Sequence, residues 1–324
     1  MWEKVKAMGK DEFKIEKKEG KSFYFIGVTT TKSSIMKLFP LWMDELGHSD
    51  IKIYPCDLKI HDNPENYRNA VAQIKYDENC YGALVTTHKM DLFSAAYDMF
   101  DYFDPYAELL HEISSISKNK GKLEGHAKDP LTSGASYDHF IEKDYYKKTG
   151  AEVLIFGAGG SSIATILHLI NKKDKGDKPS KITVVNRSQG RLDHLKEIIK
   201  KISIDIKMEY YCNEDPEVND KIMSRLPPYS IVINSTGMGK DTPGSPVTDK
   251  GLFPENGWVW EFNYRGELDF MHQAEAQQKS RNVKIEDGWI YFIHGWTQVI
   301  FQALHIDMTL ELFDKLEKIA DSIR

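Results

Sequence analysis

A glycine turn between an apolar strand and an apolar helix constrains the fold of this chain most. Residues 153–156 (Val-Leu-Ile-Phe) predict a buried strand, and residues 163–170 continue as an apolar helix. Between them, residues 157–162 (Gly-Ala-Gly-Gly-Ser-Ser) follow the dinucleotide-binding spacing, except that Ser162 holds the third glycine position. Glycines there permit a tight turn and close approach to a pyrophosphate, and the helix start offers free N–H groups. The segment predicts a Rossmann-type domain, with a plain strand-to-helix turn as the alternative.

The end of the next predicted strand distinguishes between the two nicotinamide cofactors. Asn186-Arg187-Ser188 follows strand 182–186, and Arg191 stands three residues further on. An NAD site usually has an acid here that binds both ribose hydroxyls, whereas an arginine binds a 2′-phosphate through forked, charge-assisted hydrogen bonds. The sequence therefore predicts NADP, and Arg187 carries this prediction, because Arg191 also fits a solvated helix surface.

The remaining pattern predicts two α/β domains. The first third predicts strands at 23–29, 51–56 and 81–86, helices at 35–46, 66–76 and 90–100, and short strands at 112–117 and 122–126 joined by a turn at 119–121. The second series predicts strands at 153–156, 182–186, 208–212, 230–235 and 258–263, a surface loop at 172–181, and final helices at 289–304 and 310–323. Repeated strand–helix units imply largely parallel sheets that are covered on both faces.

Composition limits the classes of function. With 324 residues, 41% hydrophobic and 28% charged, the chain suits two globular domains, and its net charge of −6 argues against a nucleic-acid partner. No apolar run is long enough to span a membrane, and the arm at residues 1–21, in which lysine and glutamate are interleaved, lacks a secretory signal and is expected to be solvated. Cys56, Cys80 and Cys212 form no CxxC pair, so we expect a reducing cytoplasm. The histidines have no metal-ligand spacing, so no metal is expected.

Several motifs occur in a characteristic order. They are Gly27 with Ser33, residues 82–89 (Gly-Ala-Leu-Val-Thr-Thr-His-Lys), 125–129 (Gly-His-Ala-Lys-Asp), the glycine turn, 186–188, 234–239 (Asn-Ser-Thr-Gly-Met-Gly), 261–264 (Glu-Phe-Asn-Tyr) and Asp287-Gly288. In this order the chain resembles the shikimate dehydrogenase family over nearly its whole length. The resemblance implies an α/β substrate domain, residues 1–130 plus 288–324, completed by the C-terminal helices. It also implies an inserted Rossmann-type NADP domain at 131–287. A homodimer is left open.

The resemblance also implies an activity. Members of the family interconvert a ring ketone and an alcohol, typically 3-dehydroshikimate and shikimate, in aromatic amino acid biosynthesis. Their catalytic pair matches Lys89 and Asp129. A lysine ammonium can stabilise and protonate the oxygen that hydride transfer leaves negative, and a neighbouring carboxylate can orient the lysine and tune its proton affinity.

Further site residues follow from the same motifs. The expected cofactor-binding residues are Gly157, Ala158, Gly159, Gly160, Ser161, Asn186, Arg187, Ser188, Arg191, Ser235, Thr236 and Gly237. The expected substrate-binding residues are Ser33, Thr86, Ser114, Tyr264 and Gln298. Two of these carry an alternative: Val85 could take the role of Thr86, and Tyr264 could touch substrate or cofactor or pack in the core.

The chain departs from the family pattern on the substrate side. Ile35 stands where the second of two carboxylate-binding serines is expected, and Ser114 and Ala127 each replace an asparagine. Gly295 replaces a glutamine, for which Gln298 on the same helical face could substitute. A pocket that loses hydrogen-bonding groups discriminates differently among hydroxylated substrates. The physiological substrate, a small cyclic hydroxy acid, is therefore left open.

Two other classes of protein remain alternatives. A non-catalytic ligand-sensing or regulatory protein could keep this fold, although the retained Lys89 and Asp129 argue against it. A related NADP enzyme could act on a folate or an aminoacyl thioester. The thioester would require a reactive cysteine near the cleft, and none of the three cysteines lies in a motif that suggests one.

Overall fold

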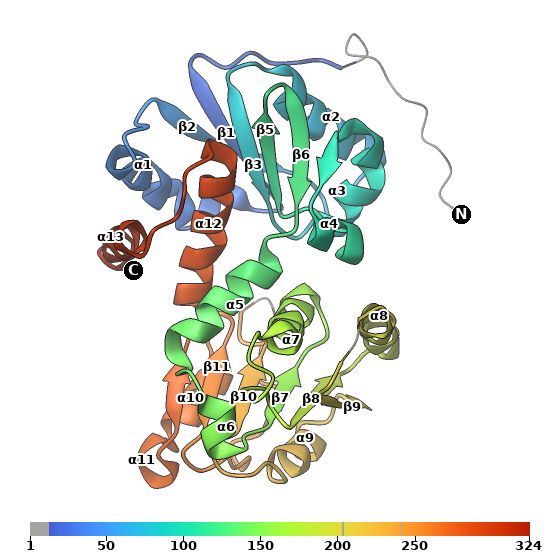
Figure 1. Cartoon of the computed structure of the whole chain (residues 1–324), viewed down its shortest axis with the longest axis vertical. Coiled ribbons are helices and arrows are strands. Elements are labelled where there is room, and N and C mark those ends of the chain that lie inside the picture. Colours follow the sequence, from blue (N-terminus) through green and yellow to red (C-terminus); the bar gives the residue numbers. More distant parts are fainter. Residues whose placement is uncertain (1–12, 203, 241) are drawn as a thin grey trace. The chain divides into compact units, whose positions relative to one another are not determined.

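The computed structural model describes residues 13–202, 204–240 and 242–324, which form two compact units, each built around one six-stranded sheet (Figure 1). Unit 1 comprises the described residues up to Lys128 together with Gly295–Arg324, and unit 2 comprises Asp129–His294. This arrangement confirms the predicted α/β class. The prediction for the arm at 1–21 lies outside the described residues as far as residue 12. From there the chain is anchored, because the N–H and the carbonyl of Glu16 each hydrogen-bond the Gln73 amide at 2.8 Å.

The sheet of unit 1 is largely parallel, as predicted, with one antiparallel strand. Its strand order is β2-β1-β3-β5-β6-β4, with bounds β1 Lys21–Gly27, β2 Ile51–Asp57, β3 Cys80–Val85, β4 Tyr102–Phe103, β5 Ser115–Asn119 and β6 Lys122–His126. Strand β5 runs antiparallel to both β3 and β6. The β5–β6 hairpin turns through Lys120 and Gly121, both at positive φ, which confirms the predicted turn. Because β3 and β6 both oppose β5, their carboxyl ends meet at one edge of the sheet.

Segments far apart in the sequence complete unit 1. Its helices are α1 Ile35–Glu45, α2 Pro64–Tyr76, α3 Lys89–Ala96, α4 Pro105–Leu110, α13 Leu310–Asp321 and the part of α12 (Trp289–Leu304) from Gly295 onward. Trp296 on α12 packs edge-on against Phe25 with 4.8 Å between ring centroids, and the Trp42 indole donates to the Leu316 carbonyl at 2.8 Å. The C-terminal helices therefore supply part of the core of unit 1.

The sheet of unit 2 is parallel throughout. Its order is β12-β11-β10-β7-β8-β9, with bounds β7 Val153–Phe156, β8 Lys181–Asn186, β9 Lys207–Cys212, β10 Ile231–Asn234, β11 Trp258–Glu261 and β12 Lys284–Glu286. The strand order reverses between β7 and β10. Ligands of such sheets bind at this switch point, outside the carboxyl ends of the strands.

The helices of unit 2 include several that the sequence pattern did not predict. They are α5 Asp129–Phe140, α6 Tyr145–Thr149, α7 Gly160–Asn171, α8 Gln189–Lys200, α9 Pro216–Met223, α10 Asp269–Glu275 and α11 Gln278–Arg281. Helix α5 packs closely on α7, because a Cβ at Gly134 would lie only 2.5 Å from His168 Nδ1 and the Ser133 and Thr165 hydroxyls are 2.7 Å apart. Small and polar residues make this contact, so no apolar stripe marks the helix.

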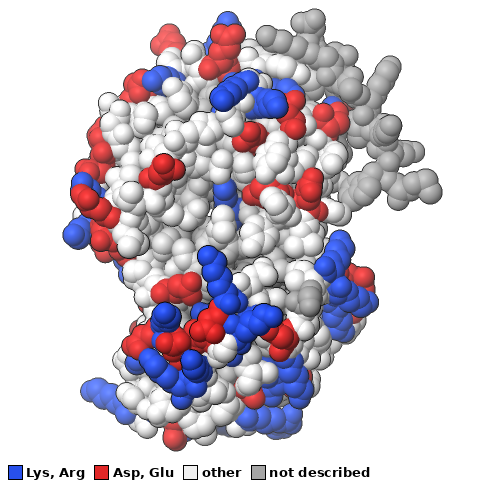
Figure 2. All heavy atoms as spheres, in the orientation of Figure 1, with Lys and Arg blue, Asp and Glu red and all other residues white. Residues whose placement is uncertain are grey.

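The face of the molecule drawn in Figure 2 shows no dominant charge of one sign. Basic and acidic side chains are mixed over the face drawn in Figure 2. No helix within the described ranges is both long enough and apolar enough to cross a membrane.

Candidate functional site

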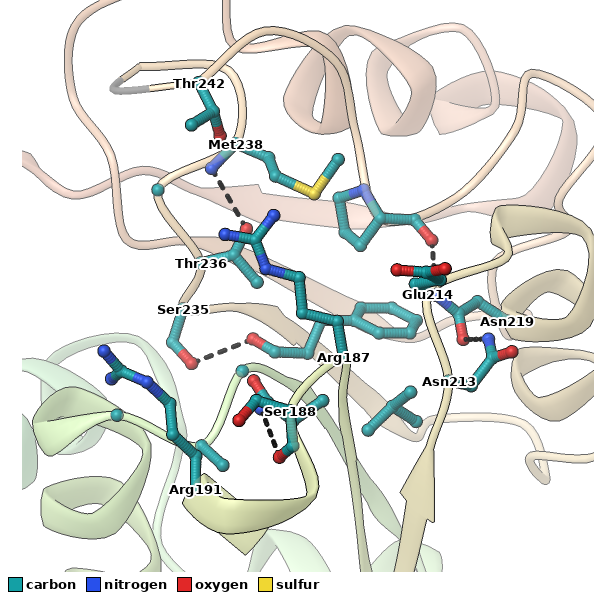
Figure 3. Close-up of a pocket in the computed structure, with 18 of the residues that line it drawn as sticks. Arg187, Ser188, Arg191, Asn213, Glu214, Asn219, Ser235, Thr236, Met238 and Thr242 are labelled. Atoms are coloured by element: carbon teal, nitrogen blue, oxygen red, sulfur yellow. Dashed lines mark hydrogen bonds between the residues drawn. The ribbon is translucent and has the colours of Figure 1, made fainter.

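A pocket of about 440 Å³ opens in unit 2 at the carboxyl ends of β7, β8 and β10 (Figure 3). Ten of the predicted cofactor residues line it: Gly157, Ala158, Gly159, Asn186, Arg187, Ser188, Arg191, Ser235, Thr236 and Gly237. The other two, Gly160 and Ser161, begin helix α7 and are not part of the lining. The pocket thus joins the glycine turn, the arginine segment and the loop after β10.

The glycine turn leaves room for a ligand. Gly157 has φ +109, and a Cβ there would lie 2.9 Å from the Ser235 carbonyl oxygen, so only glycine fits without strain. At Gly159, a Cβ would meet nothing closer than an Arg191 guanidinium nitrogen at 3.5 Å. The backbone at Gly159 therefore borders open space beside a positive charge, which suits a pyrophosphate.

Ser162, at the third glycine position, ties the turn to the neighbouring strand. Its hydroxyl lies 2.9 Å from the Gly157 carbonyl oxygen and 2.6 Å from the Ser235 hydroxyl. Ser235 in turn donates to the Phe156 carbonyl oxygen at 2.9 Å. The third glycine of the motif normally allows the helix to pack closely on the strand. Here the Ser162 hydroxyl forms hydrogen bonds instead, and these hold the ends of β7 and β10 together.

Two arginines give the pocket a positive charge. Arg187 follows β8 and Arg191 lies in the first turn of α8, and both side chains extend into the pocket region in Figure 3. Both residues are exposed, and neither guanidinium forms an ion pair or hydrogen bond with another described residue. The Asn186 amide donates to the Ser188 carbonyl at 3.0 Å and so shapes the turn between them. Unpaired arginines at this position are suited to a phosphate group.

The opposite wall contains residues that sequence reasoning missed. They are Asn213, Glu214, Asn219, Met238, Thr242, Ser245 and Pro246, together with the strand residues Phe156 and Val185. The Asn213 amide donates to Asn219 at 2.7 Å, and Asn219 donates to the Pro246 carbonyl at 2.8 Å. Asn213 directly follows β9, so its position at the carboxyl edge of the predicted sheet was the available signal.

A buried carboxyl group supports the loop after β10. Glu261 is fully buried and accepts hydrogen bonds from the Asn234 amide (2.6 Å) and from the backbone N–H (2.8 Å) and amide (2.6 Å) of Asn263. Asn234 accepts from the Thr236 hydroxyl at 2.6 Å, and the Asn263 amide donates to the Thr236 carbonyl at 3.1 Å. Burial raises the pKa of Glu261 to about 7, although its hydrogen bonds act in the opposite direction.

In unit 1, a tight turn leads from β3 to Lys89. Thr86 follows the strand, Thr87 has φ +50, and Lys89 is the first residue of α3. The Lys89 carbonyl accepts from the Ile113 N–H at 3.1 Å. A threonine in the left-handed region is strained. This turn sets the residue at which α3 begins, and therefore the position of Lys89.

The predicted substrate residue Ser33 lies at the end of a short 3₁₀ helix after β1.

Three other predicted residues have local partners. The buried Ser114 hydroxyl accepts from the Lys128 backbone N–H at 2.7 Å and lies 3.4 Å from the His126 carbonyl oxygen, so it holds the end of β6. Asp129 is buried as the first residue of α5. Tyr264 is half-buried, with its ring against those of Trp289 and Phe292 at centroid distances of 5.5 and 4.9 Å, which agrees with packing.

Gln298 is half-buried on α12. Within the described part of the chain, no group of three or more histidine, cysteine, aspartate or glutamate side chains could hold a metal ion. The individual roles predicted for the site residues remain predictions.

The fold and the pocket define a two-domain α/β protein with a Rossmann-type domain. No protein-family model matches the sequence. Curated relatives include the shikimate dehydrogenase (NADP(+)) of Lactococcus lactis subsp. cremoris MG1363, 28% identical over 55% of this chain and 59% of its own length. Another, from Nitrosopumilus maritimus SCM1, is 26% identical over 67% of this chain and 68% of its own length. The first match therefore spans less than two thirds of the relative. These relatives confirm the resemblance of the chain to the shikimate dehydrogenase family.

Solved structures share the fold over almost the whole chain. Quinate dehydrogenase from Corynebacterium glutamicum, in complex with NAD, has a TM-score of 0.73 at 16% identity and covers 94% of this chain and 99% of its own. Shikimate 5-dehydrogenase from Listeria monocytogenes, with shikimate and NAD, has a TM-score of 0.68 at 19% identity, with 93% and 96% covered. 5-Ketofructose reductase from Gluconobacter sp. strain CHM43 has a TM-score of 0.67 at 18% identity, with 94% and 99% covered.

Proposed function

We propose that this protein is an NADP-dependent dehydrogenase that acts reversibly on a small cyclic hydroxy acid, 3-dehydroshikimate/shikimate or a related compound. The pocket of unit 2 carries the proposal, because it combines a glycine turn at the switch point with two arginines that lack acidic partners in the described chain. The curated relatives are named for NADP(+) and support this cofactor.

The residues of the pocket fit the parts of NADP. The backbone at Gly157 and Gly159 and the start of α7 would bind the pyrophosphate, and Arg187 with Arg191 would bind the 2′-phosphate. When bound, the cofactor would accept or supply the hydride. Thr236, fixed through Asn234 and Asn263 to the buried Glu261, would hold one wall of the pocket in place.

Proton transfer is assigned to Lys89 and Asp129. During reduction of a ketone, the Lys89 ammonium would stabilise the developing oxyanion and give it a proton, and during oxidation neutral Lys89 would take the hydroxyl proton. Asp129 would orient the ammonium and raise its proton affinity. Ser33, Thr86, Tyr264 and Gln298 would contact the substrate, whereas Ser114 would act through the backbone of Lys128.

Free cysteines favour a reducing compartment, and we place the protein in the cytoplasm and in aromatic amino acid biosynthesis.

A ligand-sensing protein is the second candidate for the function. The observation that favours it is the loss of polar groups on the substrate side, since Ile35 is fully buried and the Ser114 hydroxyl is engaged with the backbone.

The first experiment titrates the purified protein with NADP and NAD. The second assays NADP reduction with shikimate, quinate and a panel of cyclic hydroxy acids. Tight NADP binding with turnover of any panel member supports the dehydrogenase. Tight NADP binding without turnover favours the sensor. Preferential binding of NAD would contradict the role given to Arg187.

A further inference from the structure

Lys128, next to Asp129 in the sequence, is a buried lysine with an unusual set of partners. It is 9% exposed, and its ammonium lies 2.6 Å from the side-chain oxygen of Gln302 on α12. That is the only hydrogen bond its side chain makes in the described chain, and no carboxylate forms an ion pair with it. An ammonium has three N–H donors, so two of them are available to a ligand.

The fold brings Lys128 to the same edge of the sheet as Lys89. Strand β3 leads into Lys89, and β6 leads into Lys128, and the carboxyl ends of these two strands coincide. The segment before β5 links both lysines, because the Ile113 N–H donates to the Lys89 carbonyl and the Ser114 hydroxyl accepts from the Lys128 N–H. The two lysines therefore share one hydrogen-bonded framework inside unit 1.

The surroundings of Lys128 favour an anionic ligand. Burial lowers the pKa of Lys128, and the charge of Asp104 opposes this effect only as the smaller cause. The Asp104 carboxylate is already engaged, since it accepts from the N–H groups of Ala107 (2.7 Å) and Ala127 (3.3 Å) and lies 3.6 Å from His126. A buried ammonium without a carboxylate partner is costly, so an anion that binds beside it is stabilised.

We propose that Lys128, held in place by Gln302, binds the carboxylate of the substrate. The proposal rests on the function proposed above and specifies the part of the substrate that is recognised. The contact would also compensate for the serine that is missing at position 35, because the fully buried aliphatic side chain of Ile35 cannot hydrogen-bond a carboxylate. The Lys128 ammonium would then bind the substrate carboxylate in place of the serine hydroxyl that the family pattern has at position 35.

The test compares acids with their neutral esters on the full-length protein in the presence of NADP. Binding of shikimate, quinate and their methyl esters is measured by calorimetry for the wild type and for Lys128→Met. We expect the wild type to bind an acid at least about 10-fold more tightly than its ester, and Lys128→Met to reduce this preference to about 1-fold. Lys128→Arg keeps the charge and is expected to retain part of the preference.

Controls separate recognition from folding. Lys122→Met removes an exposed lysine at the opposite end of β6 and is expected to change neither affinity. NADP affinity and the thermal unfolding midpoint report whether each variant folds. If Lys128→Met does not fold, Gln302→Leu, which keeps the ammonium but removes its partner, is expected to weaken acid binding several-fold and to leave ester binding unchanged.

Equal binding of acid and ester by the wild type would overturn the proposal, as would an unchanged preference for the acid in Lys128→Met. These outcomes are distinguishable from failure of the proposed function. Loss of that function appears as absent NADP binding or absent turnover, and neither affects the comparison of acid with ester.

Discussion

The carboxyl edges of the two sheets use different means to bind a ligand. In unit 2 the edge offers backbone at Gly157 and Gly159, a helix start and two arginines, all within a short distance along the chain. In unit 1 the edge offers side chains such as Thr86 and Lys89, which follow β3, and Lys128, which follows β6. Backbone geometry tolerates sequence change as long as the glycines remain, whereas side-chain recognition changes with each substitution. The difference accounts for the several departures from the family pattern on the substrate side, whereas the glycine turn departs only at Ser162.

Removing Lys89 should produce the largest effect and should be confined to chemistry. For Lys89→Met we expect turnover of the best substrate to fall about 1,000-fold, because proton transfer and oxyanion stabilisation are lost together. NADP affinity should remain within twofold of the wild type. The measurement is NADP reduction at saturating substrate beside an NADP titration. Wild-type turnover in this variant would remove Lys89 from the mechanism.

A methyl group at the glycine turn should test the claim that unit 2 depends on backbone geometry. Gly157→Ala forces a Cβ against the Ser235 carbonyl at φ +109, so we expect unfolding to become easier by about 3 kcal/mol and NADP binding to weaken. Gly190→Ala is the matched control, because it lies in helix α8 with nothing within 4 Å of its Cβ. It should be neutral or slightly stabilising. Urea unfolding measures both variants, and equal stability would contradict the steric argument.

The stability of the protein should depend on pH through Glu261. Its pKa is raised to about 7 in the folded protein, against an ordinary value of 4.5. Between these values the folded state binds more protons than the unfolded state, so the free energy of unfolding should fall as pH rises, by about 2 kcal/mol between pH 5 and 7. Glu261→Gln should abolish this part of the slope, whereas the exposed Glu267→Gln should keep it. Identical slopes in all three proteins would show that Glu261 does not titrate in this range.

Cofactor preference should show the smallest effect. For Arg187→Ala we expect NADP affinity to fall about 10-fold and NAD affinity to change less than twofold, since one charge-assisted contact to the 2′-phosphate is lost. Arg225→Ala removes an exposed arginine of the same unit that does not line the pocket and should change neither. Fluorescence titration with both cofactors decides the question. A parallel loss of NAD binding would mean that Arg187 acts on a part the two cofactors share.

The sequence predicted elements best where the pattern is strongly apolar. Strand β7 and helix α12 begin and end at the predicted residues, 153–156 and 289–304. Helix α5 was missed because its contact with α7 uses Ser133 and Gly134 in place of an apolar stripe. The two-residue strand β4 is too short to show any period. The largely parallel direction of the first sheet was predicted, and its one antiparallel strand, β5, belongs to the hairpin whose turn was predicted at 119–121.

The same distinction applies to the site. Residues of the glycine turn and the arginine segment were predicted because a local motif specifies them. The wall formed by Asn213, Asn219 and Pro246 was not predicted, since it depends on contacts between separate loops. Lys128 was passed over in favour of Asp129, because its burial and its partner Gln302, 174 residues further along the chain, leave no mark on the local sequence.

The discontinuity of unit 1 has a consequence for biosynthesis. Unit 2 is one uninterrupted stretch of chain, so it can fold as it leaves the ribosome, whereas unit 1 waits for helices α12 and α13. At about 5–20 residues per second, the N-terminal part of unit 1 would wait about 10–40 seconds after Lys128 is synthesised. During that interval Phe25 lacks Trp296 and Trp42 lacks the Leu316 carbonyl. The nascent chain therefore exposes apolar surface that a chaperone can bind. Truncation within the last 30 residues would destabilise unit 1 as a whole, because these residues complete its core.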